Sequence, residues 1–319
     1  MTTSLFKEYK FQYQFPQYQW ISYEDRAFDT TLYEKDGPIA RLTFNRPEKR
    51  NAFNDRQFLD LLAGLHKAAD DPEVRVVIIR GRGPAFSAGH DLSSPEGDET
   101  IPIDPKYAPS VRDYFNVERR RCGKHEDILH YPKITIAQVH GYCIGAGEGV
   151  QASCDFTIAA EDSIFGVRGF GRITLGLSFW NGSWPGGSHR ARTASAIPEM
   201  SGKDAAERGL VTRAVPKERL EEETERFARH LARMPWNTLS LLKESVNGAL
   251  DVTGMGVAWR AHYEGHISYQ YVRFRPWELN FYKTRREKGL KGFIDTRYQL
   301  TSISDKPDAD KQAQPAEKE

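Results

Sequence analysis

Residues 131–171 read YPKITIAQVHGYCIGAGEGVQASCDFTIAAEDSIFGVRGFG, and this stretch decides the fold. Two short apolar runs within it, residues 134–139 and 156–159, have the length and composition of buried strands. Between the runs, the small residues Gly145, Ala146 and Gly147 form a turn that leads into a helix-length segment. Strands that alternate with helices in this way predict a layered α/β body.

The same alternation continues on both sides of this stretch. Residues 31–33 and 39–44 predict a hairpin around the turn residues 35–38, and residues 74–80 predict a buried strand. Asn54 is suited to cap a helix whose apolar residues recur on one face. Toward the C-terminus the pattern predicts three more helices, over residues 201–208 (ended by Gly209), 217–233 and 236–250.

We divide the chain into four parts: an aromatic N-terminal arm (1–26), a core (27–235), a C-terminal helical oligomerisation region (236–302) and a disordered tail (303–319). The arm alternates aromatic with polar residues, which favours an extended segment. It either packs on the body or a neighbouring subunit, or forms a lid over a ligand. Residues 93–116 are polar and contain four prolines, which predicts a surface loop.

The composition excludes several classes of protein. The chain has 319 residues, 39% of them hydrophobic, and a formal net charge of +1. The balanced charge predicts no binding to nucleic acid or to a membrane surface, and no apolar run is long enough to cross a bilayer. Three cysteines without metal-ligand spacing predict no metal site and suit a reducing compartment. The N-terminus lacks the pattern of a signal peptide, so we expect a cytoplasmic protein.

Four ordered motifs carry a resemblance to a known family. They are NRPEKRNAF (45–53), FSAGHDL (86–92), VHGYCIGAG (139–147) and MSGKDAAERGLVTRAVP (200–216). These segments resemble the signatures of the crotonase (enoyl-CoA hydratase/isomerase) superfamily over roughly residues 28–250. The resemblance implies an α/β fold with a spiral core of ββα units, two roughly perpendicular sheets and a helical C-terminal region. It also implies a homotrimer or a dimer of trimers.

The resemblance further implies a site that binds an acyl-CoA thioester, with coenzyme A as part of the substrate and no permanently bound cofactor. Two backbone amides would stabilise the negative charge that develops on the thioester oxygen. By resemblance, these are the amides of Ala88 and Ala146. The residues around them are expected to contact substrate: Ser87, Gly89, Asp91, Leu92, Gly145, Gly149, Gly169 and Arg172.

The usual pair of acid–base carboxylates is missing from this site. In typical hydratases of the family, two glutamates flank the substrate double bond. Here the first position is Gly149, and the second is Gly169 or, counted from Leu175-Gly176, Arg172. Because water addition needs a group that moves protons, we expect this protein not to be a standard two-glutamate hydratase.

Two other residues are candidates for proton transfer. Glu148 is either a catalytic carboxylate or a helix-start acid stabilised by the dipole, since one residue along a helix turns a side chain by about a hundred degrees. His90 is either a proton carrier or a loop histidine near the CoA moiety. We expect Asp155 to tie down a loop or a helix end.

The acyl pocket is expected to include Trp180 and Trp184. These tryptophans indicate a bulky or cyclic acyl group, or they are ordinary core and subunit-contact residues. The function predicted is therefore an acyl-CoA-processing enzyme, a lyase or hydrolase, with non-standard acid–base groups. The alternatives are a CoA-thioester or C–C bond hydrolase or lyase with a naphthoate-synthase-like site, a non-catalytic acyl-CoA-binding protein, and an assembly subunit.

Overall fold

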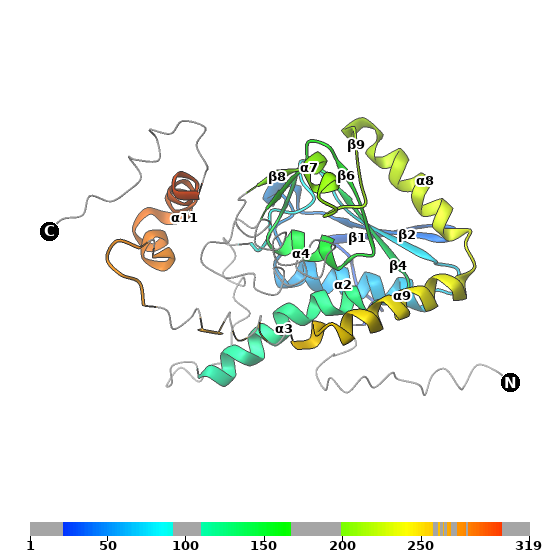
Figure 1. The fold of residues 1–319 in the computed structure, drawn as a ribbon, viewed down its shortest axis with the longest axis horizontal. Helices are drawn as coiled ribbons and strands as arrows, with labels where there is room; N and C mark the ends of the chain where they lie inside the picture. The colour runs from blue at the N-terminus through cyan, green and yellow to red at the C-terminus, as the bar shows by residue number, and fades with distance from the viewer. Residues whose placement is uncertain are drawn as a thin grey trace.

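The computed structural model describes residues 22–91, 110–166 and 199–301, with short gaps between residues 258 and 279. Most of the predicted N-terminal arm and the predicted tail lie outside these residues, so both stay predictions. The described part contains two sheets covered by helices (Figure 1). The mixed α/β class predicted from the sequence is therefore confirmed.

The larger sheet has six strands in the order β1-β2-β3-β4-β6-β9. Only the hairpin of β1 and β2 is antiparallel, and the other neighbouring strands run parallel. The smaller sheet joins three short strands in the order β5-β7-β8. The strand bounds are β1 Thr31–Asp36, β2 Ile39–Phe44, β3 Val76–Gly81, β4 Ile134–Val139, β5 Tyr142–Ile144, β6 Phe156–Ala160, β7 Ile164–Gly166, β8 Met200–Ser201 and β9 Arg213–Val215.

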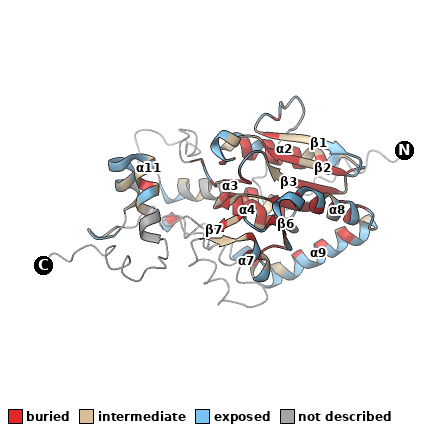
Figure 2. Cartoon of the chain, turned by 90° about the horizontal axis from the view of Figure 1, so that it is seen from above, coloured by how far each residue is buried: buried red, intermediate tan, exposed pale blue. Residues whose placement is uncertain are grey.

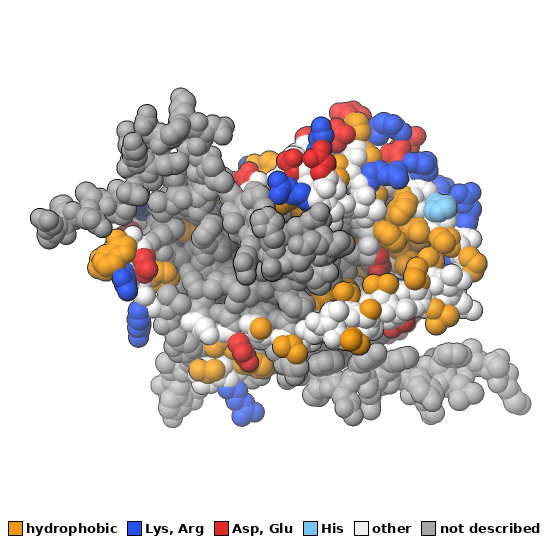
Figure 3. Space-filling model, viewed as in Figure 1, with side chains coloured by type: hydrophobic (Ala, Val, Ile, Leu, Met, Phe, Trp, Pro, Cys, Tyr) orange, Lys and Arg blue, Asp and Glu red, His pale blue; other side chains and the backbone are white. Residues whose placement is uncertain are grey.

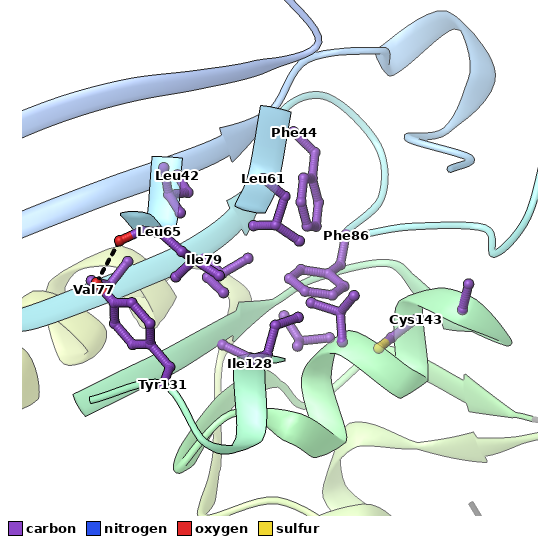
Figure 4. Packing of buried hydrophobic residues seen from close by; sticks show 14 of the residues in the cluster. Leu42, Phe44, Leu61, Leu65, Val77, Ile79, Phe86, Ile128, Tyr131 and Cys143 are labelled. Atoms are coloured by element: carbon purple, nitrogen blue, oxygen red, sulfur yellow. Dashed lines mark hydrogen bonds between the residues drawn. The ribbon is translucent and has the colours of Figure 1, made fainter. Parts of the chain in front are cut away.

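The inner parallel strands β3, β4 and β6 are mostly buried on both faces, because each face of the larger sheet is covered by helices (Figure 2). Alternate residues of one strand enter two different cores. In β3, Val77 and Ile79 pack toward α2 (Asp55–Asp70), whereas Val76 and Ile78 pack toward α8 (Leu220–Ala232). Figure 4 shows the first of these cores.

The remaining helices are α3 Val111–Leu129, α4 Ala146–Ser153, α7 Gly202–Glu207, α9 Trp236–Val252 and α11 Phe281–Thr301, with short 3-10 turns at Pro47–Lys49 and Lys217–Arg219. The predicted N-cap is confirmed, since the Asn54 side chain accepts from the Gln57 amide at 3.0 Å. Gly209 ends the helix before it with φ of 74°, as expected.

One predicted boundary is wrong. Residues 111–116 were assigned to the Pro-rich loop, but they form the first turns of α3. The prolines that suggested a loop end at Pro109, and Ser110 then begins a capping box with Asp113. The hairpin turn is also shorter than predicted, because β1 extends to Asp36 and leaves only Gly37 and Pro38 between the strands.

Helix α9 lies along the body and is tied to the larger sheet. The Lys243 ammonium lies 2.9 Å from Asp155, whose carboxylate also accepts the Thr135 amide at 2.8 Å. Asp155 therefore holds elements together, as expected. The outward face of α9 exposes apolar side chains (Figure 3), namely Leu241, Leu242, Val246 and Val252. Among the described residues, no helix is both long and apolar enough to cross a membrane.

Candidate active site

Two small-residue turns meet at the edge between the sheets. The first turn is residues 87–89 and the second turn is residues 145–147. A β-carbon added to Gly89 would lie 2.9 Å from the Ile144 carbonyl oxygen and 3.6 Å from the Ala146 nitrogen. One added to Gly145 would lie 3.8 Å from the Gly89 α-carbon. Glycine is required at position 89 for a second reason, since its φ is 91°.

The first turn is fixed by residues 45–53, which we call the clamp segment. The Ser87 hydroxyl donates to the Asn51 carbonyl at 2.7 Å. On the far side of the turn, the Phe53 amide donates to the Gly89 carbonyl at 2.7 Å, and the Asp91 amide donates to the Phe53 carbonyl at 2.8 Å. The first two family-like motifs of the sequence are therefore one structural unit.

Asn51 shapes the clamp segment from within. It is fully buried and has a left-handed φ of 53°. Its side-chain oxygen accepts the Arg46 amide at 2.9 Å, and its side-chain nitrogen donates to the Ala85 carbonyl at 2.7 Å. An asparagine tolerates this backbone conformation better than most residues. The side chain thus joins the clamp segment to the strand exit that leads into the first turn.

The structure contradicts the role expected for Ala88. Its amide donates to the Arg50 carbonyl at 2.9 Å and is therefore used within the fold. The peptide bond between Gly89 and His90 is oriented differently. Its carbonyl points to Phe53, and in a trans peptide the N–H points the opposite way. The His90 amide is thus directed away from the clamp segment.

The Ala146 amide begins α4. Ala146 is not among the residues with positive φ, so its methyl group is accommodated without backbone strain. Its N–H has no intrahelical acceptor because it is the first residue of the helix. No hydrogen bond from this amide is found among the described residues. The helix dipole adds positive potential at this position.

Glu148 is buried rather than solvated, with 5% of its surface exposed. Loss of hydration raises its pKa from 4.5 to about 7. Its Oε2 atom has no hydrogen-bond partner among the described residues. Its charge also contributes, after burial itself, to the raised pKa of the Cys143 thiol. Glu148 is therefore a carboxyl group that can exchange a proton near neutral pH.

Gly149 faces a histidine that the sequence analysis did not single out. A β-carbon on Gly149 would lie 2.6 Å from the Nε2 atom of His125, which comes from α3. The imidazole therefore fills the space that a side chain at position 149 would enter. No motif surrounds His125, and the helix that carries it was not predicted from the sequence.

The other predicted site residues either have a structural partner, are exposed, or lie outside the described residues. Asp91 forms a buried ion pair with Arg46 at 2.7 Å, which joins the end of the first turn to the clamp segment. The His90 ring is exposed and lies 6.2 Å from the Phe58 ring. The remaining predictions lie outside the described residues: Leu92, Gly169, Arg172, Trp180 and Trp184.

The family model described as enoyl-CoA hydratase/isomerase matches residues 34–261. The chain belongs to the enoyl-CoA hydratase/isomerase family. It is 35% identical over 252 residues to a putative enoyl-CoA hydratase, EchA13, of Mycobacterium tuberculosis, covering 73% of this chain and 78% of that one. It is 33% identical over 216 residues to the 1,2-epoxyphenylacetyl-CoA isomerase of Escherichia coli, covering 66% of this chain and 79% of that one.

Solved structures agree with this family assignment. An enoyl-CoA hydratase/isomerase from Xanthobacter autotrophicus matches with a TM-score of 0.72 and 30% identity, over 84% of this chain and 97% of that one. An enoyl-CoA hydratase from Mycobacterium smegmatis matches with a TM-score of 0.71 and 30% identity, over 84% of this chain and 92% of that one. The crotonase-like fold implied by the four motifs is confirmed, and this member of the family is an acyl-CoA-processing enzyme.

Proposed function

We propose that this enzyme stabilises the enolate of an acyl-CoA thioester with the backbone amides of His90 and Ala146. The contact between the two turns carries the proposal, because it brings two peptide groups to one spot with no side chain between them. Both are fixed in advance, one by the clamp segment and one by the start of α4. Such preorganised donors commonly supply the largest catalytic contribution.

The reaction class that this arrangement favours is proton transfer next to the thioester carbonyl, as in double-bond isomerisation. Gly149 offers no carboxylate for two-glutamate hydration, whereas Glu148 is a buried carboxyl with a pKa of about 7. Hydrolysis of the thioester, and hydrolysis or cleavage of a C–C bond, pass through similar oxyanions and are the second candidates. A bulky or cyclic acyl group is proposed from Trp180 and Trp184 in the sequence.

The oligomer is a further part of the proposal. A homotrimer or a dimer of trimers would cover the exposed apolar side chains of α9, Leu241 and Leu242 among them. Sedimentation of the full chain tests this. A monomer at micromolar concentration would remove this part of the proposal and leave the chemistry untouched.

The chemistry is tested with a panel of CoA thioesters, while free CoA and product mass are followed. A product of unchanged mass with a shifted double bond supports isomerisation. Released CoA indicates hydrolysis, and a smaller acyl product indicates C–C cleavage. A panel that binds without turnover contradicts the enzyme and supports a binding protein.

The role of the second turn is tested with Ala146→Pro. Proline is tolerated at the first position of a helix but has no N–H to donate. We expect kcat to fall about 10²- to 10³-fold while α4 and the fold persist. Ala146→Gly retains the N–H and is the matched control, with activity close to wild type. Equal activity of the two variants would contradict the assigned donor.

A further inference from the structure

The position of His125 has a chemical consequence. Its Nε2 atom lies 2.6 Å, and its Cδ2 atom 2.9 Å, from the place of a β-carbon on Gly149. Gly149 stands three residues after Ala146 on α4, which is about 4.5 Å along the helix axis. The imidazole is therefore held about one helical turn from an amide of the proposed oxyanion hole.

Aromatic packing links His125 to the first turn as well. The Phe58 ring of α2 meets the His125 ring edge-on, with centroids 5.7 Å apart and planes at 81°. The same Phe58 stacks on Phe53 of the clamp segment at 4.3 Å and lies 6.2 Å from the His90 ring. One phenyl ring thus connects the imidazole to the residue whose amide is the other proposed donor.

We propose that His125 is a catalytic residue of this site and moves the proton at the acyl carbon beside the thioester carbonyl. The inference rests on the proposed function and deepens it. Gly149 is required because any side chain there would displace the imidazole from its place beside α4. Elements α3 and α4 pack directly against each other, so the ring is supplied from a different part of the chain than the two turns.

The proton balance closes without another reactant. In a double-bond isomerisation, the neutral Nε2 takes a proton from the α-carbon, and the C–H electron pair enters the enolate. The enolate oxygen accepts hydrogen bonds from the His90 and Ala146 amides. The imidazolium then returns the proton at the γ-carbon, which shifts the double bond and regenerates neutral imidazole.

The charged groups around the ring include both signs. Glu148 precedes Gly149 on α4, and Lys124 and Glu126 flank His125 on α3. The Lys124 ammonium lies 3.4 Å from Asp55 of α2 and 5.1 Å from the centre of the Phe58 ring. Position 148 is rotated by about a hundred degrees around the α4 axis from position 149. The Glu148 carboxyl and the His125 imidazole therefore approach the site from different sides.

The test compares His125→Gln and His125→Ala with wild type on the thioester that wild type consumes fastest. We expect kcat to fall about 10²- to 10⁴-fold with KM changed by less than about threefold. Added imidazole should restore part of the kcat of His125→Ala by occupying the space left by the ring. His130→Ala, at the exposed end of the same helix, is the control and should retain wild-type rates.

A second pair of variants tests whether a side chain at position 149 competes with His125 for the same space. Gly149→Glu should be inactive, because its side chain and His125 compete for one place. The double variant with His125→Ala and Gly149→Glu removes this conflict and supplies a carboxylate, so it should exceed both single variants. The glutamine variant remains informative if the alanine variant misfolds, since it retains a polar side chain of similar reach.

The outcomes separate the inference from the proposed function. A wild-type protein that consumes no thioester of the panel overturns both. An active wild type with His125→Gln and His125→Ala within about twofold of its kcat overturns only the role of His125. Variants that raise KM while kcat stays unchanged also overturn it, because they assign His125 to binding.

Discussion

The proposed oxyanion side of this site uses main-chain groups, whereas the proposed proton-transfer side uses side chains of two helices. On the first side, four hydrogen bonds to the clamp segment fix the turn that carries the His90 amide. On the second side, Glu148 is buried with an unpartnered oxygen among the described residues, and His125 fills the space at Gly149. The main-chain groups are therefore held in place by hydrogen bonds, whereas the two side chains are held by burial and close packing.

The largest effect is expected from placing a side chain in the contact between the two turns. In Gly89→Ala, the new methyl group lies 2.9 Å from the Ile144 carbonyl at a φ of 91°. We expect a loss of more than about 100-fold in kcat/KM, since the turns must separate and a donor is displaced. Steady-state kinetics measures this.

The hairpin supplies the matched control. Gly37 has a φ of 54°, but a β-carbon there would meet nothing within 4 Å. Gly37→Ala should therefore lose about 1 kcal/mol of stability from backbone strain and retain its rates. Wild-type rates for both variants would show that the contact at Gly89 is not needed for activity.

On the proton-transfer side, stability should depend on the ionisation of Glu148. Burial raises its pKa from 4.5 to about 7, so the folded state binds the proton more tightly than the unfolded chain. The free energy of unfolding should therefore decrease as pH rises from 4.5 to 7 and then level off. Glu148→Gln should remove this decrease and be more stable at pH 8 by at most about 3 kcal/mol.

Urea unfolding between pH 4.5 and pH 8 measures this dependence. The same change at Glu207, which is exposed on α7, is the control and should leave the wild-type slope in place. Parallel curves for wild type and Glu148→Gln would mean that the Glu148 carboxyl is hydrated in solution.

The smallest effect is expected next to the clamp segment. Asn54 caps α2 immediately after Phe53, and Asn54→Ala should cost about 1 kcal/mol of stability. The hydrogen bonds of Phe53 to the first turn are made by its own backbone, so the rate should be unchanged. Thermal unfolding and kinetics measured on one sample test both statements. A lower kcat would show that the clamp segment depends on the helix behind it.

The sequence predicted the fold better than it predicted the site. Strands β2 and β4 have the predicted bounds, because their apolar runs are short and both faces are buried. Helix α3 was not predicted, since the Pro-rich composition before Ser110 outweighed its capping box. A helix was predicted to follow the turn at residues 145–147, and α4 begins within that turn, at Ala146.

Two parts of the site could not be found in this way. The sequence placed the first donor at Ala88, whose amide is used within the fold. The His90 amide that we propose instead could not be found, because the direction of each amide depends on the φ of Gly89 and on hydrogen bonds to a segment some 36 residues away. His125 was missed because its proposed role depends on how α3 packs on α4, and a lone histidine on a helix carries no motif. Tertiary contacts decide both features.

The clamp segment also bears on the order in which the protein folds. Its contacts with the first turn join residues about 36 positions apart, across α2 and β3 only, and the entropic cost of closing a loop grows slowly with its length. The partner turn arrives only after α3 has been added to the chain. During synthesis we therefore expect the first turn, with its proposed oxyanion donor, to form before the second turn packs against it.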